Sequence, residues 1–194
     1  ASEAVLMSTQ FNNFVLAARG EKIFSSASSE VSQGIPAATA MTGSGILNMD
    51  STDGFSSSGT VQINSEIFTY TGKTALTLTG VTRATSSTTA ATHAVDDVVS
   101  ETWTVRDTGR TDAARYNFER YNFDGNEKII VVDQTNAPTI FNASLAATDV
   151  SNSAVAGAKH IAAFKNHMFY SGMSATPQEI VFSEPFDEDG FTAS

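Results

Sequence analysis

Hydrophobic residues alternate with hydroxyl-bearing residues along the middle of the chain. Between Gly54 and Gly80, pairs of apolar residues spaced two apart stand among threonines and serines: Val61 and Ile63, Phe68 and Tyr70, Leu76 and Leu78. A period of two is typical of half-buried β-strands, because successive side chains of a strand point to opposite faces of the sheet. Two short breaks carry residues that tolerate tight hairpin turns, Asn64-Ser65 and Gly72-Lys73. The pattern predicts a three-stranded antiparallel meander.

The segment around this meander is rich in serine and threonine. Residues 51–100 contain 20 of them among 50 positions, and β-branched threonine favours the extended backbone of a strand. We therefore expect residues 49–100 to form a small β-module that includes a serine-, threonine- and alanine-rich connection over residues 82–94. Strand patterns at residues 98–99 and 103–105 then return the chain to its parent fold, so the module is inserted between residues 1–48 and 101–194.

Further strands follow closely in the second half of the chain. The apolar pattern predicts them at residues 128–132, 139–142, 160–164, 167–171 and 179–183, with a hairpin turn at Lys165-Asn166. Ahead of them, the alternation of aromatic residues changes phase between Phe118 and Tyr121, which predicts a bulge or a bend. Near the start of the chain the pattern is ambiguous, because the spacing of Phe11, Phe14 and Val15 fits both a short helix and a strand.

Two stretches of the second half repeat the order apolar strand, polar turn, proline and strand. They cover residues 129–142 and 168–183, and their prolines, Pro138 and Pro177, lie 39 residues apart. This spacing is close to the roughly 40–50 residues of a β-propeller blade, although any antiparallel meander produces similar echoes. The predicted fold is mainly β, with antiparallel sheets, a partial propeller-like platform in residues 101–194 to which residues 1–48 contribute, and the inserted module.

Composition narrows the classes of function. The chain has 21 acidic and 11 basic residues, a formal net charge of -10, and no cysteine. Cysteine-based metal sites, disulfides and thiolate nucleophiles are therefore excluded. The charge disfavours tight binding of nucleic acid, which depends on lysine and arginine contacts to phosphates. It suits a surface past which DNA slides without sticking, although solubility is the simpler explanation.

Length and hydropathy complete this picture. The 194 residues fit one large domain, or one domain with a small insertion. We find neither a membrane-spanning apolar run nor the profile of a signal peptide. The first residue is not methionine, which agrees with processing or with a piece of a longer polypeptide.

Three groups of residues are candidates for a metal-binding or catalytic site. His160 and His167 fall at opposite ends of a predicted hairpin, too far apart to share a metal ion. The acidic turn Asp187-Glu188-Asp189-Gly190 resembles a calcium loop in charge but lacks the 12-residue ligand pattern of an EF-hand. The carboxylates of Asp96, Asp97 and Glu101 could in principle serve glycoside hydrolysis. We therefore predict no catalytic residue, no cofactor and no metal.

Two sets of residues resemble a known family. The first is the stretch over residues 51–61 together with Phe68-Thr69-Tyr70-Thr71-Gly72-Lys73, Gly80-Val81-Thr82-Arg83 and His93, which is similar to a small β-module that recurs in virion proteins of tailed bacteriophages. The second is Gly109-Arg110-Thr111, Arg115-Tyr116-Asn117-Phe118 and the stretches over residues 132–138, 164–170 and 182–189, which resemble the tail nozzle or tail tubular proteins of short-tailed phages. The two regions span about three quarters of the chain.

The resemblance implies a function for the chain in the virion. It implies a propeller-like platform, six copies around the tail axis and a channel for the genome. We accordingly expect a non-enzymatic structural subunit of the phage tail, assembled in the host cytoplasm, whose partners are copies of itself, neighbouring tail proteins and passing DNA that is not specifically bound. Alternatives are a fibre or adhesion module that binds host-surface glycan, a head–tail connector or capsid-associated protein, and a particle-borne cell-wall glycosidase.

The residues expected at the subunit contact are aromatic or acidic. The aromatic candidates serve a subunit contact only where their rings are exposed, and packing in the core is the more common role for each. The full set is Tyr116, Phe118, Tyr121, Phe123, Asp187, Glu188 and Asp189.

Overall fold

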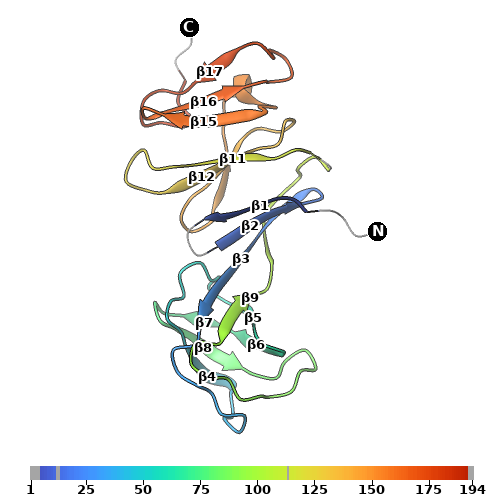
Figure 1. Ribbon diagram of the computed structural model, residues 1–194, viewed down its shortest axis with the longest axis vertical. Coiled ribbons are helices and arrows are strands. Elements are labelled where there is room, and N and C mark those ends of the chain that lie inside the picture. The colour runs from blue at the N-terminus through green and yellow to red at the C-terminus, as the bar shows by residue number, and fades with distance from the viewer. Residues whose placement is uncertain (1–4, 12–13, 113, 192–194) are drawn as a thin grey trace. The chain divides into compact units, whose positions relative to one another are not determined.

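The computed structural model describes residues 5–11, 14–112 and 114–191, and these residues form an almost purely β structure (Figure 1). The expected mainly β fold with antiparallel sheets is confirmed. The single helical element among the described residues is a short 3-10 turn, η1 (Ser153–Val155). No helix in this part of the chain is long and apolar enough to cross a membrane.

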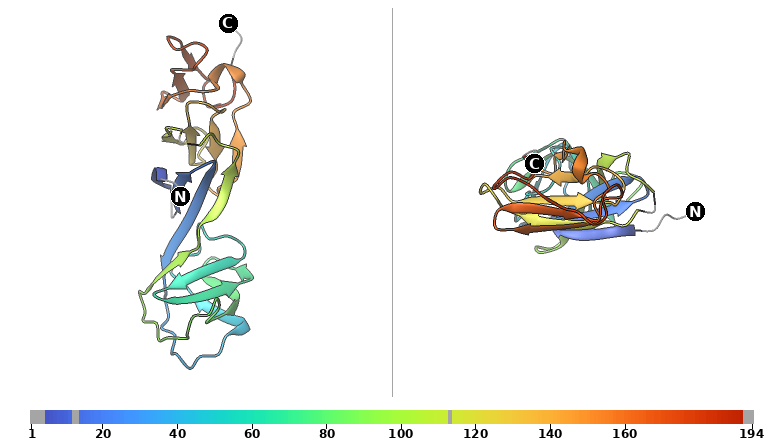
Figure 2. Two further views of the ribbon diagram at one scale, coloured as in Figure 1. Left: turned by 90° about the vertical axis from the view of Figure 1, so that its right-hand side faces the viewer. Right: turned by 90° about the horizontal axis from the view of Figure 1, so that it is seen from above.

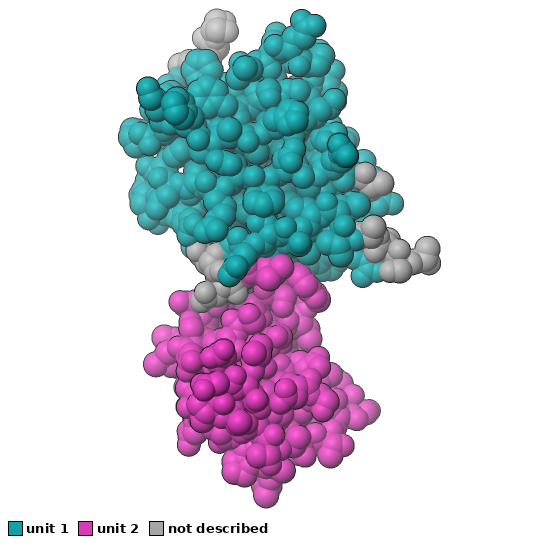
Figure 3. All heavy atoms as spheres, viewed as in Figure 1, with its two compact units in different colours: residues 1–11, 16–24, 105–194 teal, residues 12–15, 25–104 magenta. Residues whose placement is uncertain are grey.

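The chain divides into two compact units (Figure 3). Unit 1 comprises Ala1–Phe11, Leu16–Phe24 and Val105–Ser194, and unit 2 comprises Asn12–Val15 and Ser25–Thr104. Unit 2 therefore begins well before the expected module of residues 49–100, because strand β3 (Lys22–Glu30) runs from unit 1 into unit 2 and supplies one of its strands.

Unit 2 is a curled antiparallel sheet. Its strands follow the order β3, β9 (Val98–Glu101), β5 (Gly59–Ile63), β6 (Glu66–Tyr70), β8 (Thr77–Thr82) and β4 (Thr42–Asn48). Beyond the ends of β3 and β4, an isolated antiparallel bridge joins Val31 to Met49, and Asp50 N–H donates to the Glu30 carbonyl oxygen. The two margins of the sheet thus meet and enclose one interior.

Alternation along the strands fills this interior with apolar side chains. The inward positions of β5, β6, β8 and β9 are fully buried at Val61, Ile63, Phe68, Leu78, Val81 and Val99. Their neighbours in sequence, such as Gln62, point to the outer face. The period-two pattern therefore explains how a stretch so rich in serine and threonine still builds a core.

The two predicted turns of the meander have different outcomes. Asn64-Ser65 is confirmed as a two-residue turn, because Ile63 pairs with Glu66 and Asn64 has a positive φ of 54°. The prediction for Gly72-Lys73 is wrong. These two residues form β7 (Gly72–Lys73), which pairs with β8, and the chain reverses over the next residues, where Thr74 N–H donates to the Thr77 carbonyl oxygen.

Unit 1 contains two consecutive antiparallel meanders. The first has four strands, β11 (Asn117–Tyr121), β12 (Lys128–Val132), β13 (Thr139–Phe141) and β14 (Ala147–Asp149), and the second has three, β15 (His160–Phe164), β16 (His167–Ser171) and β17 (Ile180–Phe182). Figures 1 and 2 show these sheets stacked with the first strands of the chain, β1 (Val5–Phe11) and β2 (Phe14–Arg19). The strand β10 (Thr104–Thr108) pairs with β3.

A hydrophobic core lies between the two meanders. It joins side chains of β11, β12, β13 and β16 with residues of the connection around η1: Tyr121, Ile130, Val132, Ile140, Val150, Val155, Ala158, Met168, Tyr170 and Met173. The two sheets therefore pack face to face. Their antiparallel meanders are established, whereas a propeller-like arrangement of sheets stays a prediction.

Most of the local predictions for unit 1 agree with the structure. The five predicted strands are confirmed within one residue at each end, and the Lys165-Asn166 turn is confirmed by φ values of 48° and 65°. Of the bulge or bend predicted between Phe118 and Tyr121, the bulge is ruled out, because β11 pairs with β12 in unbroken register. The two rings change phase because residues three apart on one strand face opposite sides. Phe11 and Phe14 belong to strands, not to a helix.

The interior of unit 2 generates a matched test. Ile63 is fully buried on β5, whereas Ile46 on β4 is more than half exposed. We expect Ile63→Ala to lower the free energy of unfolding by about 2–5 kcal/mol, since it leaves a cavity. Ile46→Ala should change it by no more than about 0.5 kcal/mol. Chemical denaturation followed by circular dichroism compares them, and equal losses would contradict the assignment of the inner face.

Candidate functional site

The buried charges of unit 2 form one cluster around Glu66. The Arg83 guanidinium donates two parallel hydrogen bonds to the Glu66 carboxylate, with Nε–Oε1 at 2.8 Å and Nη2–Oε2 at 2.7 Å. His93 Nε2 lies 2.8 Å from Glu66 Oε2. All three side chains are buried, and such bidentate pairing supplies both strength and orientation.

The same cluster holds the long connection that follows β8. The Arg83 guanidinium also donates to backbone carbonyl oxygens, those of Pro36, Thr39 and Ala91. The Glu66 carboxylate accepts hydrogen bonds from the N–H groups of Ala84 and Ala91. These bonds replace regular secondary structure, so Glu66, Arg83 and His93 fix this connection to the sheet.

Hydrogen bonding governs the ionisation of Glu66. Burial alone would raise the pKa of this carboxyl. Hydrogen bonds from Arg83, the Ala91 N–H and His93 outweigh burial and lower the pKa to about 2. The carboxylate is thus held ionised as a structural acceptor and is poorly suited to accept or deliver a proton in catalysis near neutral pH.

Arg110 has a comparable position in unit 1. This buried guanidinium donates to the Asp107 carboxylate through Nε, to the Ala137 carbonyl oxygen at 2.9 Å and to Asp149 Oδ1 at 2.8 Å. Asp133 in turn accepts hydrogen bonds from the N–H groups of Thr135 and Asn136 and so shapes the turn between β12 and β13. Arg110 therefore braces the four-stranded meander.

The acidic turn at Asp187 is held by bonds within unit 1. Asp187 Oδ1 accepts from the N–H groups of Asp189 and Gly190, and Asp189 Oδ1 accepts from Ser151 N–H. Glu188 is buried and pairs with Lys128 Nζ at 2.6 Å. The turn anchors the C-terminal segment to both meanders, and its role at a subunit contact stays a prediction.

The aromatic candidates for the subunit contact divide into two groups. Tyr116 and Tyr121 are buried, and Phe123 packs against the core between the meanders. Tyr116 and Tyr121 therefore have the more common role, packing inside the protein, and Tyr121 belongs to the core between the two meanders. Phe118 lies on the opposite face of β11 from Tyr121 and, at 39%, is the most exposed of the four.

The structure separates the remaining residues that could serve as catalytic or metal-binding groups. The predicted hairpin register is confirmed, with His160 opposite Ser171 and His167 opposite Phe164. Glu101 is buried and its Oε1 accepts from Tyr70 Oη at 2.8 Å and from Ser56 N–H. Asp96 is exposed, so the two carboxylates do not face one cleft as a glycosidase pair requires.

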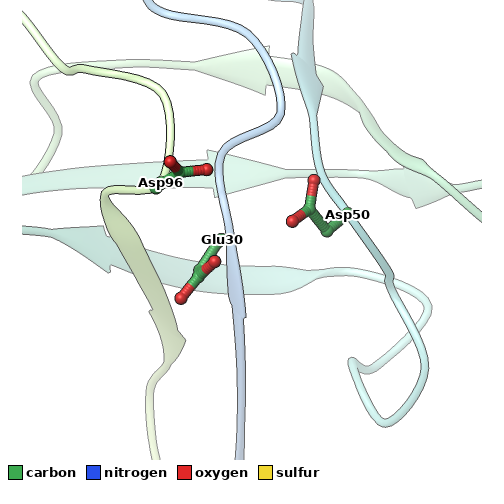
Figure 4. A group of neighbouring side chains, drawn as sticks. All are labelled: Glu30, Asp50 and Asp96. Atoms are coloured by element: carbon green, nitrogen blue, oxygen red, sulfur yellow. The ribbon is translucent and has the colours of Figure 1, made fainter.

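Asp96 instead lies beside two other exposed carboxylates, Glu30 and Asp50, where the margins of the unit 2 sheet meet (Figure 4). One oxygen from each lies within 4.8 Å of the others. Carboxylate oxygens are the ligands that Ca²⁺ prefers, so these three could hold such an ion. Sequence reasoning missed the group because its members are 20 and 46 residues apart.

A further feature missed from the sequence is an aromatic outer face on the three-stranded meander. Phe164 on β15, Phe169 on β16 and Phe182 on β17 lie on this face with Ile180. The rings of Phe169 and Phe182 are 5.7 Å apart, and Phe182, Phe164 and Ile180 are 58%, 60% and 67% exposed. The His167 ring contacts Phe169 and Phe182 on the same face, and an exposed aromatic patch of this kind is a candidate interaction surface. The signal in the sequence was the large apolar residues at outward positions of β15–β17, where His160, His167 and Ser171 also lie.

Comparison with known proteins adds no relative: no protein-family model, curated protein or solved structure matches the chain. The functional argument therefore depends on the residues themselves.

The buried pair of Glu66 and Arg83 has a solvent-exposed counterpart in Arg120 and Glu127, whose Nη2–Oε1 distance is also 2.7 Å. Glu66→Gln should lower the free energy of unfolding by about 3–5 kcal/mol, since it leaves the Arg83 charge buried without its partner. Glu127→Gln should cost no more than about 1 kcal/mol. Chemical denaturation measures the unfolding free energy of both variants. Similar decreases would show that burial does not control how much an ion pair contributes to stability.

The low pKa of Glu66 predicts how stability depends on pH. Because the pKa of this group is lower in the folded state than in the unfolded chain, its contribution is fully present above about pH 4.5 and is lost as the pH falls towards 2. The difference between these pKa values corresponds to roughly 3 kcal/mol. Glu66→Gln should flatten the fall in unfolding free energy over this window. If the unfolding free energy of Glu66→Gln falls between pH 4.5 and 2 as steeply as that of the exposed-site variant Glu179→Gln, the low pKa of Glu66 is contradicted.

Proposed function

We propose that this chain is a structural subunit of a bacteriophage tail, similar to tail nozzle proteins, and that it assembles with copies of itself into a ring around the channel for the genome. The observation that carries the proposal is the aromatic outer face of β15–β17. In this proposal the function of the chain is mechanical, and the chain performs no covalent chemistry.

The aromatic outer face supports assembly through its shape and composition. Sheets pack face to face by interleaving apolar side chains from their facing surfaces, and the inner face of the same meander already packs in this way against β11–β14. The outer face offers Phe164, Phe169, Phe182 and Ile180 for a second contact of the same kind. In a closed ring each copy buries this face against its neighbour, so this face is not left open to solvent.

Charge and the use of polar groups also support a structural subunit. The formal net charge of -10 allows a ring to surround DNA without gripping its phosphates. The buried ionisable side chains Glu66, Arg83, Arg110 and Glu188 are each engaged in hydrogen bonds or ion pairs that hold the fold. These groups are therefore committed to structure.

The oligomeric state of the full chain tests the proposal. Native mass spectrometry and sedimentation over a range of concentrations should detect a ring of copies, with six expected. Phe182→Ser should raise the dissociation constant of the assembly at least about tenfold, which corresponds to roughly 1.4 kcal/mol. The matched variant Leu76→Ser changes an equally exposed residue of unit 2 and should leave assembly intact. A chain that stays monomeric at every concentration would refute the proposal.

A further inference from the structure

A groove lies on the outer face of unit 2, over the strands β3, β9 and β5. It has a volume of about 590 Å³ and is lined by Ser26, Gln62, Asn64, Val98, Ser100, Glu101, Thr102 and Trp103. This volume lies within the range of about 300–1,000 Å³ that is usual for sites of small ligands. All lining residues belong to unit 2.

Two exposed apolar side chains give the groove its hydrophobic part. Trp103 is the chain's only tryptophan and is 54% exposed, and Val98 is 53% exposed. Tryptophan offers a large rigid ring face with little conformational entropy to lose on binding. An open ring beside a polar groove is therefore a preformed platform for the flat apolar face of a ligand.

Neutral polar groups of adjacent strands surround this platform. Gln62 on β5 is the direct cross-strand neighbour of Ser100 on β9, and Ser100 in turn is opposite Ser28 on β3. Gln62 Nε2 donates one hydrogen bond to the Asn64 carbonyl oxygen, and Asn64 Nδ2 donates to Asp97 Oδ2. These bonds fix the two amides, which keep a second N–H and a side-chain oxygen each for a ligand.

Charge defines the class of ligand. The groove has no lysine or arginine among its lining residues, and its single charged member, Glu101, directs Oε1 to Tyr70 and Ser56. An anion would meet an acidic protein without a counter-charge. An aromatic platform, hydroxyl groups and paired amides instead match a ligand that has both an apolar ring face and many hydroxyl groups.

We propose that this groove binds a neutral oligosaccharide, with a sugar ring stacked on Trp103 and its hydroxyl groups hydrogen-bonded to Gln62, Asn64 and Ser100. The inference concerns unit 2 alone and goes beyond assembly, which depends on the aromatic outer face of unit 1. A chain that assembles without binding sugar, or binds sugar without assembling, separates the two proposals.

The full chain is first applied to an array of oligosaccharides, and the neutral oligosaccharide that gives the strongest signal is then titrated in solution with tryptophan fluorescence and calorimetry. We expect saturable binding with a change in Trp103 emission. Trp103→Ala should weaken binding at least tenfold by calorimetry, and Gln62→Ala should weaken it severalfold. Leu76→Ala, which removes an equally exposed side chain of unit 2 outside the groove, should bind as the unmodified chain does.

Circular dichroism verifies that each variant is folded. Absence of any neutral saccharide signal on the array overturns the proposal. Binding that survives in both Trp103→Ala and Gln62→Ala at full affinity also overturns it, because the sugar then binds elsewhere on the chain.

Discussion

The ion pair between Arg83 and Glu66 is the interaction on which unit 2 depends. A guanidinium and a carboxylate taken out of water are costly unless each satisfies the other's hydrogen bonds, and here nearly every donor and acceptor has a partner among His93, the backbone carbonyl oxygens and the Ala84 and Ala91 N–H groups. The pair thereby holds a long, irregular connection that has little regular secondary structure of its own. Removing one partner leaves the other as an uncompensated buried charge.

Arg110 applies the same principle in unit 1. Its fork joins the segment after β10 to the carbonyl oxygen of Ala137 and to Asp149 at the edge of the four-stranded meander. Each guanidinium holds several acceptors at once, three carbonyl oxygens and a carboxylate at Arg83, and one carbonyl oxygen and two carboxylates at Arg110. Lysine cannot reproduce this planar fork of donors. In both units, these buried charges brace interiors that are otherwise apolar.

Much of the fold could be predicted from the sequence, because alternation is a local property. The strands from Lys128 to Phe182 and the turn at Lys165-Asn166 follow from short apolar runs and from residues that accept positive φ. The turn predicted at Gly72-Lys73 is absent. These residue types are common in turns, but pairing with Thr79 and Leu78 holds the two residues extended. Which face of a strand becomes buried is set by the sheet that packs on it, so Tyr121 and Phe118 could not be sorted in advance.

The candidate sites were harder to predict than the strands, because each is formed by residues that are far apart in the sequence. Arg83 and His93 stood out as members of a motif, but their partner Glu66 did not. The available signal was its phase, since an acidic residue shares the inward face of β6 with Phe68 and Tyr70. The groove at Trp103 and the aromatic outer face arise from strands that meet only in the folded chain.

The most direct test of a self-assembling structural subunit is a cryo-electron microscopy reconstruction of the assembled full chain at side-chain resolution. We expect a closed ring in which Phe164, Phe169 and Phe182 of each copy are covered by a neighbouring copy. A ring in which these rings remain open to solvent, or particles that contain a single copy, would contradict assembly through this face.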